Sequence, residues 1–237
     1  MARLSPTLAT ERSLMESGFR FVAGADEVGR GALAGPVTVG MVVVDASAQK
    51  PLAGVKDSKL LSVAERERLV PLIKEWSLAH AVGHASAAEI DAIGIMAALQ
   101  LAGTRAWEQM QESPIRAEVV LLDGNHDWLS AKGQLSIFDQ PLPAGAGVQV
   151  PVQTMIKADL QCLSVAAASV LAKVERDAIL VELDGQHAEF GWKVNKGYAT
   201  AAHRAAIDQF GPSQWHRKSW KLSSGASSRL TGAMGKA

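Results

Sequence analysis

The stretch GADEVGRGALAGPV, residues 24–37, connects two segments that are rich in apolar and β-branched residues. It places Asp26 beside Glu27 at the end of the first segment and then sets Arg30 between two glycines. Adjacent carboxylates repel each other, and glycine weakens regular structure. The stretch therefore predicts a functional turn between two strands, whose negative charge needs compensation from elsewhere.

Strand patterns and helix patterns alternate along the chain. Apolar or alternating residues predict five strands, at residues 19–26, 36–45, 77–86, 117–124 and 148–157. Helices are expected at residues 7–18, 63–76, from 86 toward 112, and 160–183. The second and third begin with capping boxes, in which Ser62 precedes Glu65 and Ser86 precedes Glu89. Strands that alternate with long helices predict an α/β fold.

The composition limits the class of protein. The 237 residues are 48% hydrophobic and 20% charged, which suits one large domain or a domain with an appendage. The single cysteine, Cys162, excludes an internal disulfide and suits a reducing cytoplasm. No apolar run reaches the roughly 18 residues of a membrane span, and residues 1–19 lack the apolar core of a signal peptide. We therefore expect a cytoplasmic protein without a membrane partner.

The net charge of zero hides an asymmetry along the chain. Residues 191–237 contain eight Lys or Arg and one Asp, a charge of +7, so residues 1–190 carry −7. This basic segment indicates a polyanionic partner, and an ordinary solvated surface is the alternative. Residues 223–237 are rich in Ser and Gly, which predicts a flexible tail.

Acidic residues lie at or just after the ends of three predicted strands. Asp26 and Glu27 end the first, Asp123 ends the fourth, and Asp159 follows the fifth. Sites in open α/β sheets form where the loops at strand ends converge, so we expect these carboxylates to lie together. Two such charges about 4 Å apart repel by roughly 4 kcal/mol at an effective dielectric near 20. Oxygen ligands favour Mg²⁺ or Mn²⁺, and a pair of such ions suits phosphodiester hydrolysis.

Each acid also has a plainer interpretation. An Asp at a strand end is often a turn residue, and Asp159 is suitably placed to cap the following helix. Moreover, a regular strand directs adjacent side chains to opposite faces. We therefore expect either that the strand ends or bulges at Asp26 and Glu27, or that one of them reaches the site from a different direction.

The turn Gly29-Arg30-Gly31 does not match a dinucleotide-binding fingerprint, because G-x-G-x-x-G requires glycine where Ala34 stands. Glycines leave backbone groups accessible to a ligand, and Arg30 offers a guanidinium to a phosphate. We interpret the turn as a segment whose backbone groups bind a sugar hydroxyl. The alternative is a turn that connects two strands and has no binding role.

Taken together, these motifs resemble those of the bacterial ribonuclease HII family, the type 2 ribonucleases H. Six blocks match in family order: GADEVGRGALAGPV at 24–37, KDSKLLS at 56–62, LLDG at 121–124, KADLQCLSVAAASVLAKVERD at 157–177, KGYATAAH at 196–203 and HRKSW at 216–220. The departures, such as Leu60 in place of Lys and Ala158 in place of Gly, remove no carboxylate.

The resemblance implies a ribonuclease H-like α/β fold with a five-stranded mixed sheet flanked by helices and a C-terminal helical extension. Residues 1–190 would form the catalytic domain, and residues 191–222 a basic helical segment that binds substrate. The implied activity is that of an endoribonuclease acting on RNA–DNA hybrids and on DNA duplexes with embedded ribonucleotides. It cleaves 5′ to the ribonucleotide, leaves a 3′-hydroxyl and a 5′-phosphate, and so removes ribonucleotides from DNA.

The resemblance also implies two sets of site residues. Four catalytic carboxylates would hold two Mg²⁺ or Mn²⁺ ions, namely Asp26, Glu27, Asp123 and Asp159. The second set would bind substrate: Gly29, Arg30 and Gly31 at the ribonucleotide 2′-OH, Tyr198 on the neighbouring sugar, and Lys59 and Lys173 as further candidates for phosphate contacts. Without the family match, Tyr198 would be interpreted as a packing residue at a helix start.

Two other segments have structural interpretations. The small residues AAAS at 166–169 predict close packing of a helix on the sheet. Basic and aromatic residues mix in WHRKSW at 215–220, which suits nucleic-acid contact. For Trp215 and Trp220 the alternative is docking of the C-terminal segment on the core.

Two alternative functions remain at this point. One is another nuclease of the same superfold, such as a resolvase or the type 1 enzyme, against which the Gly-Arg-Gly turn and Tyr198 argue. The other is a non-catalytic module that binds hybrids, against which four intact acids argue, because clustered negative charge weakens phosphate binding. We expect a monomer.

Overall fold

A computed structural model of the protein describes residues 5–131 and 147–223. Its centre is a five-stranded sheet in the order β3-β2-β1-β4-β5. The strands are β1 (Phe21–Val28), β2 (Val37–Asp45), β3 (Ala79–Ala85), β4 (Val119–Asp123) and β5 (Val152–Met155). β1 pairs antiparallel with β2 and parallel with β4, so the sheet is mixed, as predicted.

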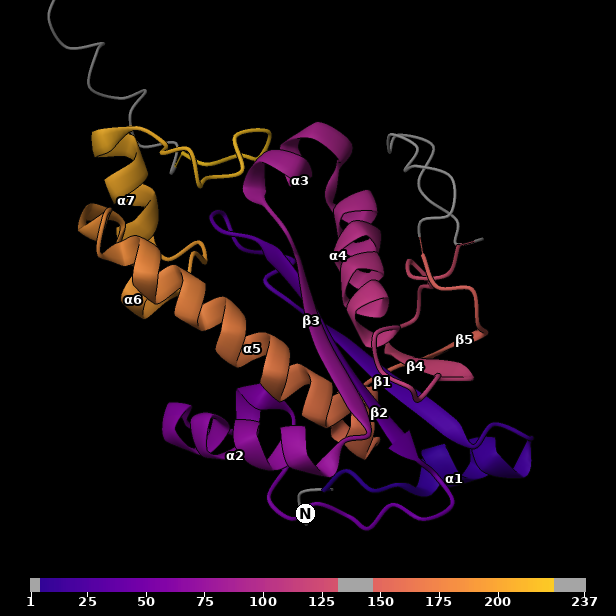
Figure 1. Ribbon diagram of the computed structural model, residues 1–237. Coiled ribbons are helices and arrows are strands. Elements are labelled where there is room, and N and C mark those ends of the chain that lie inside the picture. The colour runs from indigo at the N-terminus through magenta and orange to yellow at the C-terminus, as the bar shows by residue number, and fades with distance from the viewer. Residues whose placement is uncertain (1–4, 132–146, 224–237) are drawn as a thin grey trace, which may run out of the picture.

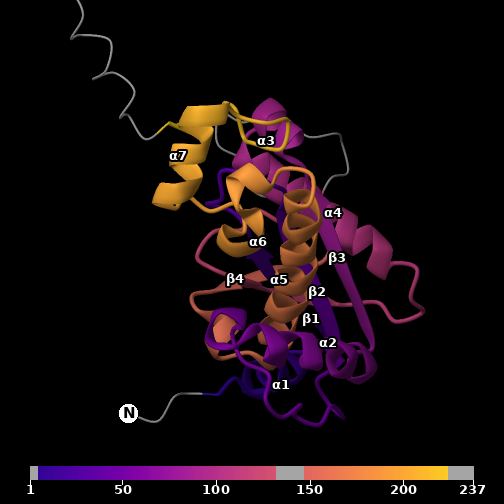
Figure 2. The ribbon, with the colours of Figure 1, turned by 90° about the vertical axis from the view of Figure 1, so that its left-hand side faces the viewer.

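Helices cover both faces of the sheet (Figure 1). One face packs against α5 (Leu163–Asp184), α2 (Val63–Trp76) and α1 (Ala9–Glu16), and the other against α3 (Ala87–Ile93) and α4 (Ile95–Met110). The short α6 (Trp192–Asn195) and α7 (Ala201–Phe210) lie at one end of α5, opposite the end that meets α2 (Figure 2). The predicted α/β fold with a C-terminal helical extension is confirmed. No helix in the two described ranges is long and apolar enough to cross a membrane.

The two predicted capping boxes are present, but the helix that follows the second is shorter than expected. Ser62 accepts from the Glu65 amide and Ser86 from the Glu89 amide. The continuous helix predicted from residue 86 toward 112 is wrong, since α3 ends at Ile93 and α4 begins at Ile95. Gly94 has a φ of +81°, in the left-handed region that ends a helix and that glycine adopts without strain.

The run of small residues in α5 lies directly on β1 and β2, as predicted. A Cβ at Gly40 would overlap the Ala168 carbonyl oxygen, and one at Gly24 would overlap the Ser164 backbone. This approach, possible only without side chains between helix and strand, brings α5 over the end of β1 that carries Asp26.

The N-terminus of α5 is capped by a residue from the far end of the sequence. Glu11 on α1 is fully buried and accepts from both the Ser164 amide, at 2.9 Å, and the Ser164 hydroxyl, at 2.7 Å. Asp159 lies in a separate 3₁₀ turn, Ala158–Leu160, which ends before α5 begins. The alternative in which Asp159 caps this helix is therefore wrong.

Replacing Glu11 by Ala is expected to lower the free energy of unfolding by about 2–4 kcal/mol. The substitution leaves two buried Ser164 donors, the amide and the hydroxyl, without an acceptor. Glu11→Gln, which keeps an acceptor oxygen, is the matched control and should lose less. Chemical denaturation measures both, and equal losses would contradict the capping role.

The C-terminal extension packs against the turn that follows β1. Its buried residues form one cluster with that turn and with the end of α5: Leu33, Ala34, Leu180, Leu183, Phe190, Trp192, Ala206 and Ile207. In the segment 215–220, His216 and Arg217 are buried, at 1% and 0% exposure. Trp215 and Trp220 pack against the same cluster, which confirms docking for the two tryptophans, and the burial of His216 and Arg217 leaves neither available for nucleic-acid contact. Of the predicted flexible tail, residues 224–237 lie outside the described residues.

Candidate active site

The structure brings the four predicted acids to one end of the sheet. Asp26 and Glu27 lie on β1, Asp123 ends β4, and Asp159 follows β5. The pairing of β1 with β4 reaches Ala25 opposite Leu122, which places Asp123 level with Asp26. The Asp123 carboxylate accepts from the Ala158 amide at 2.7 Å and so fixes the turn that carries Asp159.

Strand β1 neither ends nor bulges at its two acids. The antiparallel register with β2 continues without interruption through Asp26 and Glu27 to Val28. Of the two expectations, the break in the strand is wrong, and the acids leave β1 from opposite faces. The two acids are nevertheless linked electrostatically, because Asp123, which follows the last β1–β4 pair, raises the pKa of both.

Burial and mutual repulsion perturb the acids strongly. Burial raises the pKa of Asp26 well above its usual value, and the charges of Glu27 and Asp123 raise it further. Burial also raises the pKa of Glu27, which Arg30 partly offsets, and that of Asp159, to which Asp123 adds. The cluster therefore carries more negative charge than its surroundings stabilise.

A fifth carboxylate, absent from the predicted set, belongs to the same cluster. Asp57 is 6% exposed, caps the short turn Ser58–Leu60, and adds to the negative charge felt by Asp159. It lies within the KDSK block, where the sequence presents it as an ordinary turn residue. The ammonium of Lys59 lies 3.3 Å from Asp159 Oδ2 and 3.7 Å from Asp57 Oδ1.

A pair of serines, also missed from the sequence, orients Asp26. Ser169 on α5 donates to the Asp26 carboxylate, and its hydroxyl lies 2.8 Å from that of Ser58. Both serines are buried, at 0% and 1% exposure. The available signal is that Ser169 is the one polar residue in the AAAS run, whose small residues predict packing alone.

In residues 5–131 and 147–223, no three His, Cys, Asp or Glu side chains are already arranged as a metal-binding group. The chemistry of the acid cluster nevertheless fits a hard divalent cation. Its donors are carboxylate oxygens, and their raised pKa values reflect uncompensated negative charge. Two cationic side chains offset part of this charge: Lys59 at Asp159, and Arg30, whose guanidinium lies 3.6 Å from Glu27 Oε1.

The predicted substrate residues line one pocket of about 470 Å³ beside the acids. All six contribute to it: Gly29, Arg30, Gly31, Lys59, Lys173 and Tyr198. Tyr198 is 37% exposed and precedes α7, so it is accessible from the pocket that it lines. The ammonium of Lys173 is engaged by Asp177 on the same helix, 2.6 Å away.

Comparison with known proteins gives consistent similarities. The family model for Ribonuclease HII matches residues 23–223. Ribonuclease HII of Streptomyces avermitilis is 44% identical over 216 residues, which are 91% of this chain and 83% of that protein. The crystal structure of ribonuclease H2 from Pyrococcus horikoshii OT3 superposes with a TM-score of 0.64 at 26% identity, covering 86% of this chain and 95% of that one. Bst-RNase HIII in complex with Mn²⁺ has the same fold, with a TM-score of 0.59 at 22% identity over 81% and 63% of the two chains.

Proposed function

The chain belongs to the ribonuclease HII family and is a ribonuclease H enzyme, and from this premise we propose that it is a metal-dependent endoribonuclease that cleaves 5′ to ribonucleotides in RNA–DNA hybrids and in duplex DNA. The products are a 3′-hydroxyl and a 5′-phosphate. The proposed role is removal of ribonucleotides from DNA, in the cytoplasm and as a monomer.

The main support for this proposal is that a pocket suited to a sugar lies directly beside a cluster of carboxylates. A pocket with exposed backbone at Gly29–Gly31 and an accessible tyrosine ring at Tyr198 opens beside a cluster of buried carboxylates. The first surface suits a sugar with a 2′-hydroxyl, and the second suits divalent ions at the adjoining phosphate. A pure phosphate-binding module gains nothing from the second surface.

In the proposed mechanism the acid tetrad, Asp26, Glu27, Asp123 and Asp159, would hold Mg²⁺ or Mn²⁺. When bound, the ions supply activation of a water nucleophile and stabilisation of the leaving oxygen. Ser169 keeps the Asp26 carboxylate oriented. The Gly29–Gly31 backbone would bind the 2′-hydroxyl, and Tyr198 would stack on the neighbouring sugar, which selects the phosphodiester to be cleaved.

The test uses a DNA duplex with one ribonucleotide, the same duplex made only of DNA, and an RNA–DNA hybrid. We expect Mg²⁺ or Mn²⁺ to support cleavage of the first and third, 5′ to a ribonucleotide, and not of the second. EDTA should stop both reactions. If the ribonucleotide-containing duplex stays intact with both ions, the proposed function is refuted.

Replacing Lys59 by Met is expected to tighten Mn²⁺ binding to the substrate-free protein by about tenfold. Against the effect of burial, the charges of Asp57, Asp26 and Asp159 raise the pKa of Lys59, so its ammonium acts as the counter-ion of the cluster. Removing this charge removes a competitor of the metal. Isothermal titration measures the affinity without any cleavage.

The matched control for this variant is Lys56→Met. Lys56 lies in the same loop, but the acid with which its charge interacts is Glu65 of α2. Its substitution should leave the affinity for Mn²⁺ within about twofold. If Lys59→Met also leaves the affinity unchanged, the ammonium does not occupy the region where the ion binds.

A further inference from the structure

Two buried arginines lie beneath the turn that follows β1. Arg176 on α5 and Arg217 in the C-terminal extension are both 0% exposed. Within the described residues neither guanidinium forms an ion pair with a carboxylate, and both donate to backbone carbonyl oxygens instead. A buried charge without an opposite charge is unusual and calls for a physical reason.

Nearly all of these carbonyls belong to the turn itself. Arg217 donates to Arg30 O at 2.8 Å, to Gly29 O at 2.7 Å, and to Gly35 O at 3.2 Å. Arg176 donates to Pro36 O at 2.9 Å, to Ala34 O at 3.1 Å, and to Lys196 O. The two side chains therefore hold the turn from both of its ends.

The hydrogen bonds of Arg217 determine which way the peptide groups of Gly29–Gly31 point. In a trans peptide the N–H points opposite to the C=O. Because the carbonyls of Gly29 and Arg30 face the Arg217 guanidinium, the amides of Arg30 and Gly31 face away from it. Neither amide donates to an acceptor elsewhere in the described chain, and both residues line the pocket.

Arg176 fixes the same turn by contact. A Cβ at Gly29 would overlap the Arg176 side chain, so that chain packs directly against the glycine backbone. Its guanidinium carbon also lies 5.5 Å from the centre of the Tyr198 ring. One arginine thus links the turn to the aromatic residue that lines the same pocket.

Stability alone does not account for these arginines. Burial lowers the pKa of Arg217 to about 9, because desolvation disfavours its charge. Charge-assisted hydrogen bonds to carbonyls offset that cost, but an apolar side chain would avoid it. The guanidinium fixes the orientation of the Gly29 and Arg30 carbonyls. Its charge also polarises these two peptide groups, so that their N–H groups become stronger hydrogen-bond donors.

We propose that Arg217 is a positioning residue for substrate discrimination, supported by Arg176, because it turns the amides of Arg30 and Gly31 toward the pocket to bind a ribose hydroxyl. This inference rests on the proposed function. Arg217 is fully buried and does not line the pocket, so it acts through the backbone that it holds.

The test compares the binding of a duplex with one ribonucleotide and of the same duplex made only of DNA, with Ca²⁺ replacing Mg²⁺ to slow cleavage. Arg217→Lys keeps the charge but cannot hold two carbonyls in one plane. We expect it to reduce the preference for the ribonucleotide duplex by about tenfold, while the affinity for the DNA duplex stays within about twofold. A purely structural role would weaken both affinities alike.

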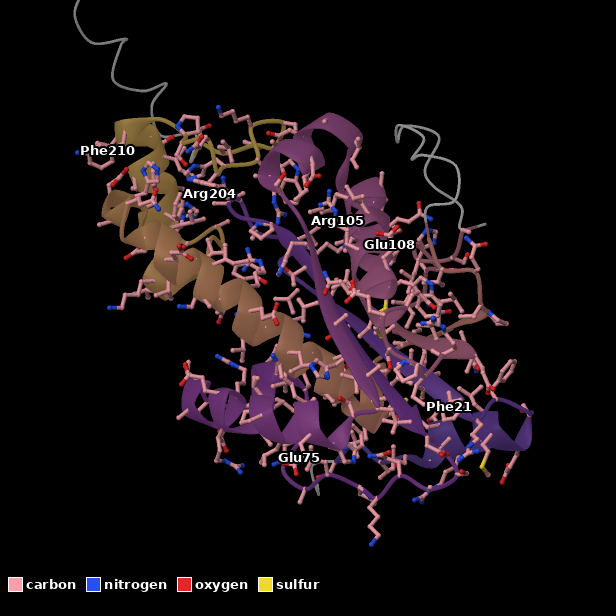
Figure 3. All side chains as sticks on the ribbon, in the orientation of Figure 1. Phe21, Glu75, Arg105, Glu108, Arg204 and Phe210 are labelled. Atoms are coloured by element: carbon pink, nitrogen blue, oxygen red, sulfur yellow. The ribbon has the colours of Figure 1, made fainter. Side chains whose placement is uncertain are left out.

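The matched control is Arg204→Lys. Arg204, labelled on α7 in Figure 3, also donates to backbone carbonyls, those of Lys221 and Leu222, but not to the turn. Its substitution should leave the preference unchanged. Retention of the full preference by folded Arg217→Lys would overturn the inference, whereas absence of any preference in the wild-type protein would instead refute the proposed function.

A second measurement needs no variant. In ¹H–¹⁵N spectra of the wild-type protein, the ribonucleotide duplex should shift the Arg30 and Gly31 amide signals, and the DNA duplex should shift them much less. Equal shifts with the two duplexes would overturn the inference even if Arg217→Lys fails to fold.

Discussion

Replacing Asp26 by Asn is expected to reduce cleavage of a ribonucleotide-containing duplex by about a thousandfold or more. Asn has the same shape and can still accept from Ser169, but it removes the negative charge from the most deeply buried carboxylate of the cluster, which is one of the proposed metal ligands. Binding of the duplex should persist, since the pocket residues remain. Single-turnover kinetics with Mg²⁺ and with Mn²⁺ measure the loss.

The same substitution should not weaken the fold. The pKa of Asp26 is raised, so at neutral pH the folded protein stabilises this carboxylate less than water does. A neutral Asn ends its repulsion with Glu27 and Asp123, and the free energy of unfolding should stay unchanged or rise by about 1 kcal/mol. Substantial residual cleavage by Asp26→Asn would contradict the proposed metal role of this carboxylate.

Asp45→Asn is the matched control. Asp45 ends β2 and is also buried, but it lies 2.6 Å from the Arg20 guanidinium, which lowers its pKa. This change should cost stability and leave cleavage intact. Opposite effects at the two aspartates would separate a functional carboxylate from a structural one.

Replacing Gly29 by Ala is expected to have the second largest effect, a loss of cleavage of about a hundredfold with about 2–4 kcal/mol of stability. Gly29 has a φ of +86°, and its added Cβ would overlap the Arg176 side chain. Either the turn or the arginine must move, and the pocket backbone moves with it. Cleavage kinetics and chemical denaturation should be measured on the same preparation.

Gly31→Ala provides the comparison within the same turn. Nothing lies within 4 Å of a Cβ at Gly31, so its free energy of unfolding should match that of the wild-type protein. Its methyl group would enter the pocket that Gly31 lines, and cleavage should fall without loss of stability. If Gly29→Ala is as stable as the wild-type protein, the Arg176 side chain can move aside at little cost, and the predicted loss of stability is wrong.

Much of the fold was predictable because its signals are local. The capping box at Ser62 and Glu65 starts α2 at the predicted residue, and the apolar run before Asp123 is a buried strand. The helix break at Gly94 was missed because a single glycine within a helical pattern is often tolerated. Its positive φ arises from the change of direction between α3 and α4.

The candidate site was predictable only in part. The acids at the strand ends and the turn Gly29–Gly31 are recognisable in the sequence, because charged residues and paired glycines are uncommon at the end of an apolar strand. Asp57 and Ser169 do not, because each fits its local turn or helix without a further role. Whether such residues reach a site depends on which segments lie beside them.

The sequence by itself therefore determined the elements, their order and the family of the chain, since periodicity, capping and motifs act over a few residues. Only the tertiary structure showed that Asp26 and Glu27, on opposite faces of a regular strand, both feel the charge of Asp123 at the end of β4. It also decided that Arg217, an apparent surface cation, is buried beneath a turn 188 residues from it in the chain. Burial and hydrogen bonding depend on contacts between distant segments, which no local pattern encodes.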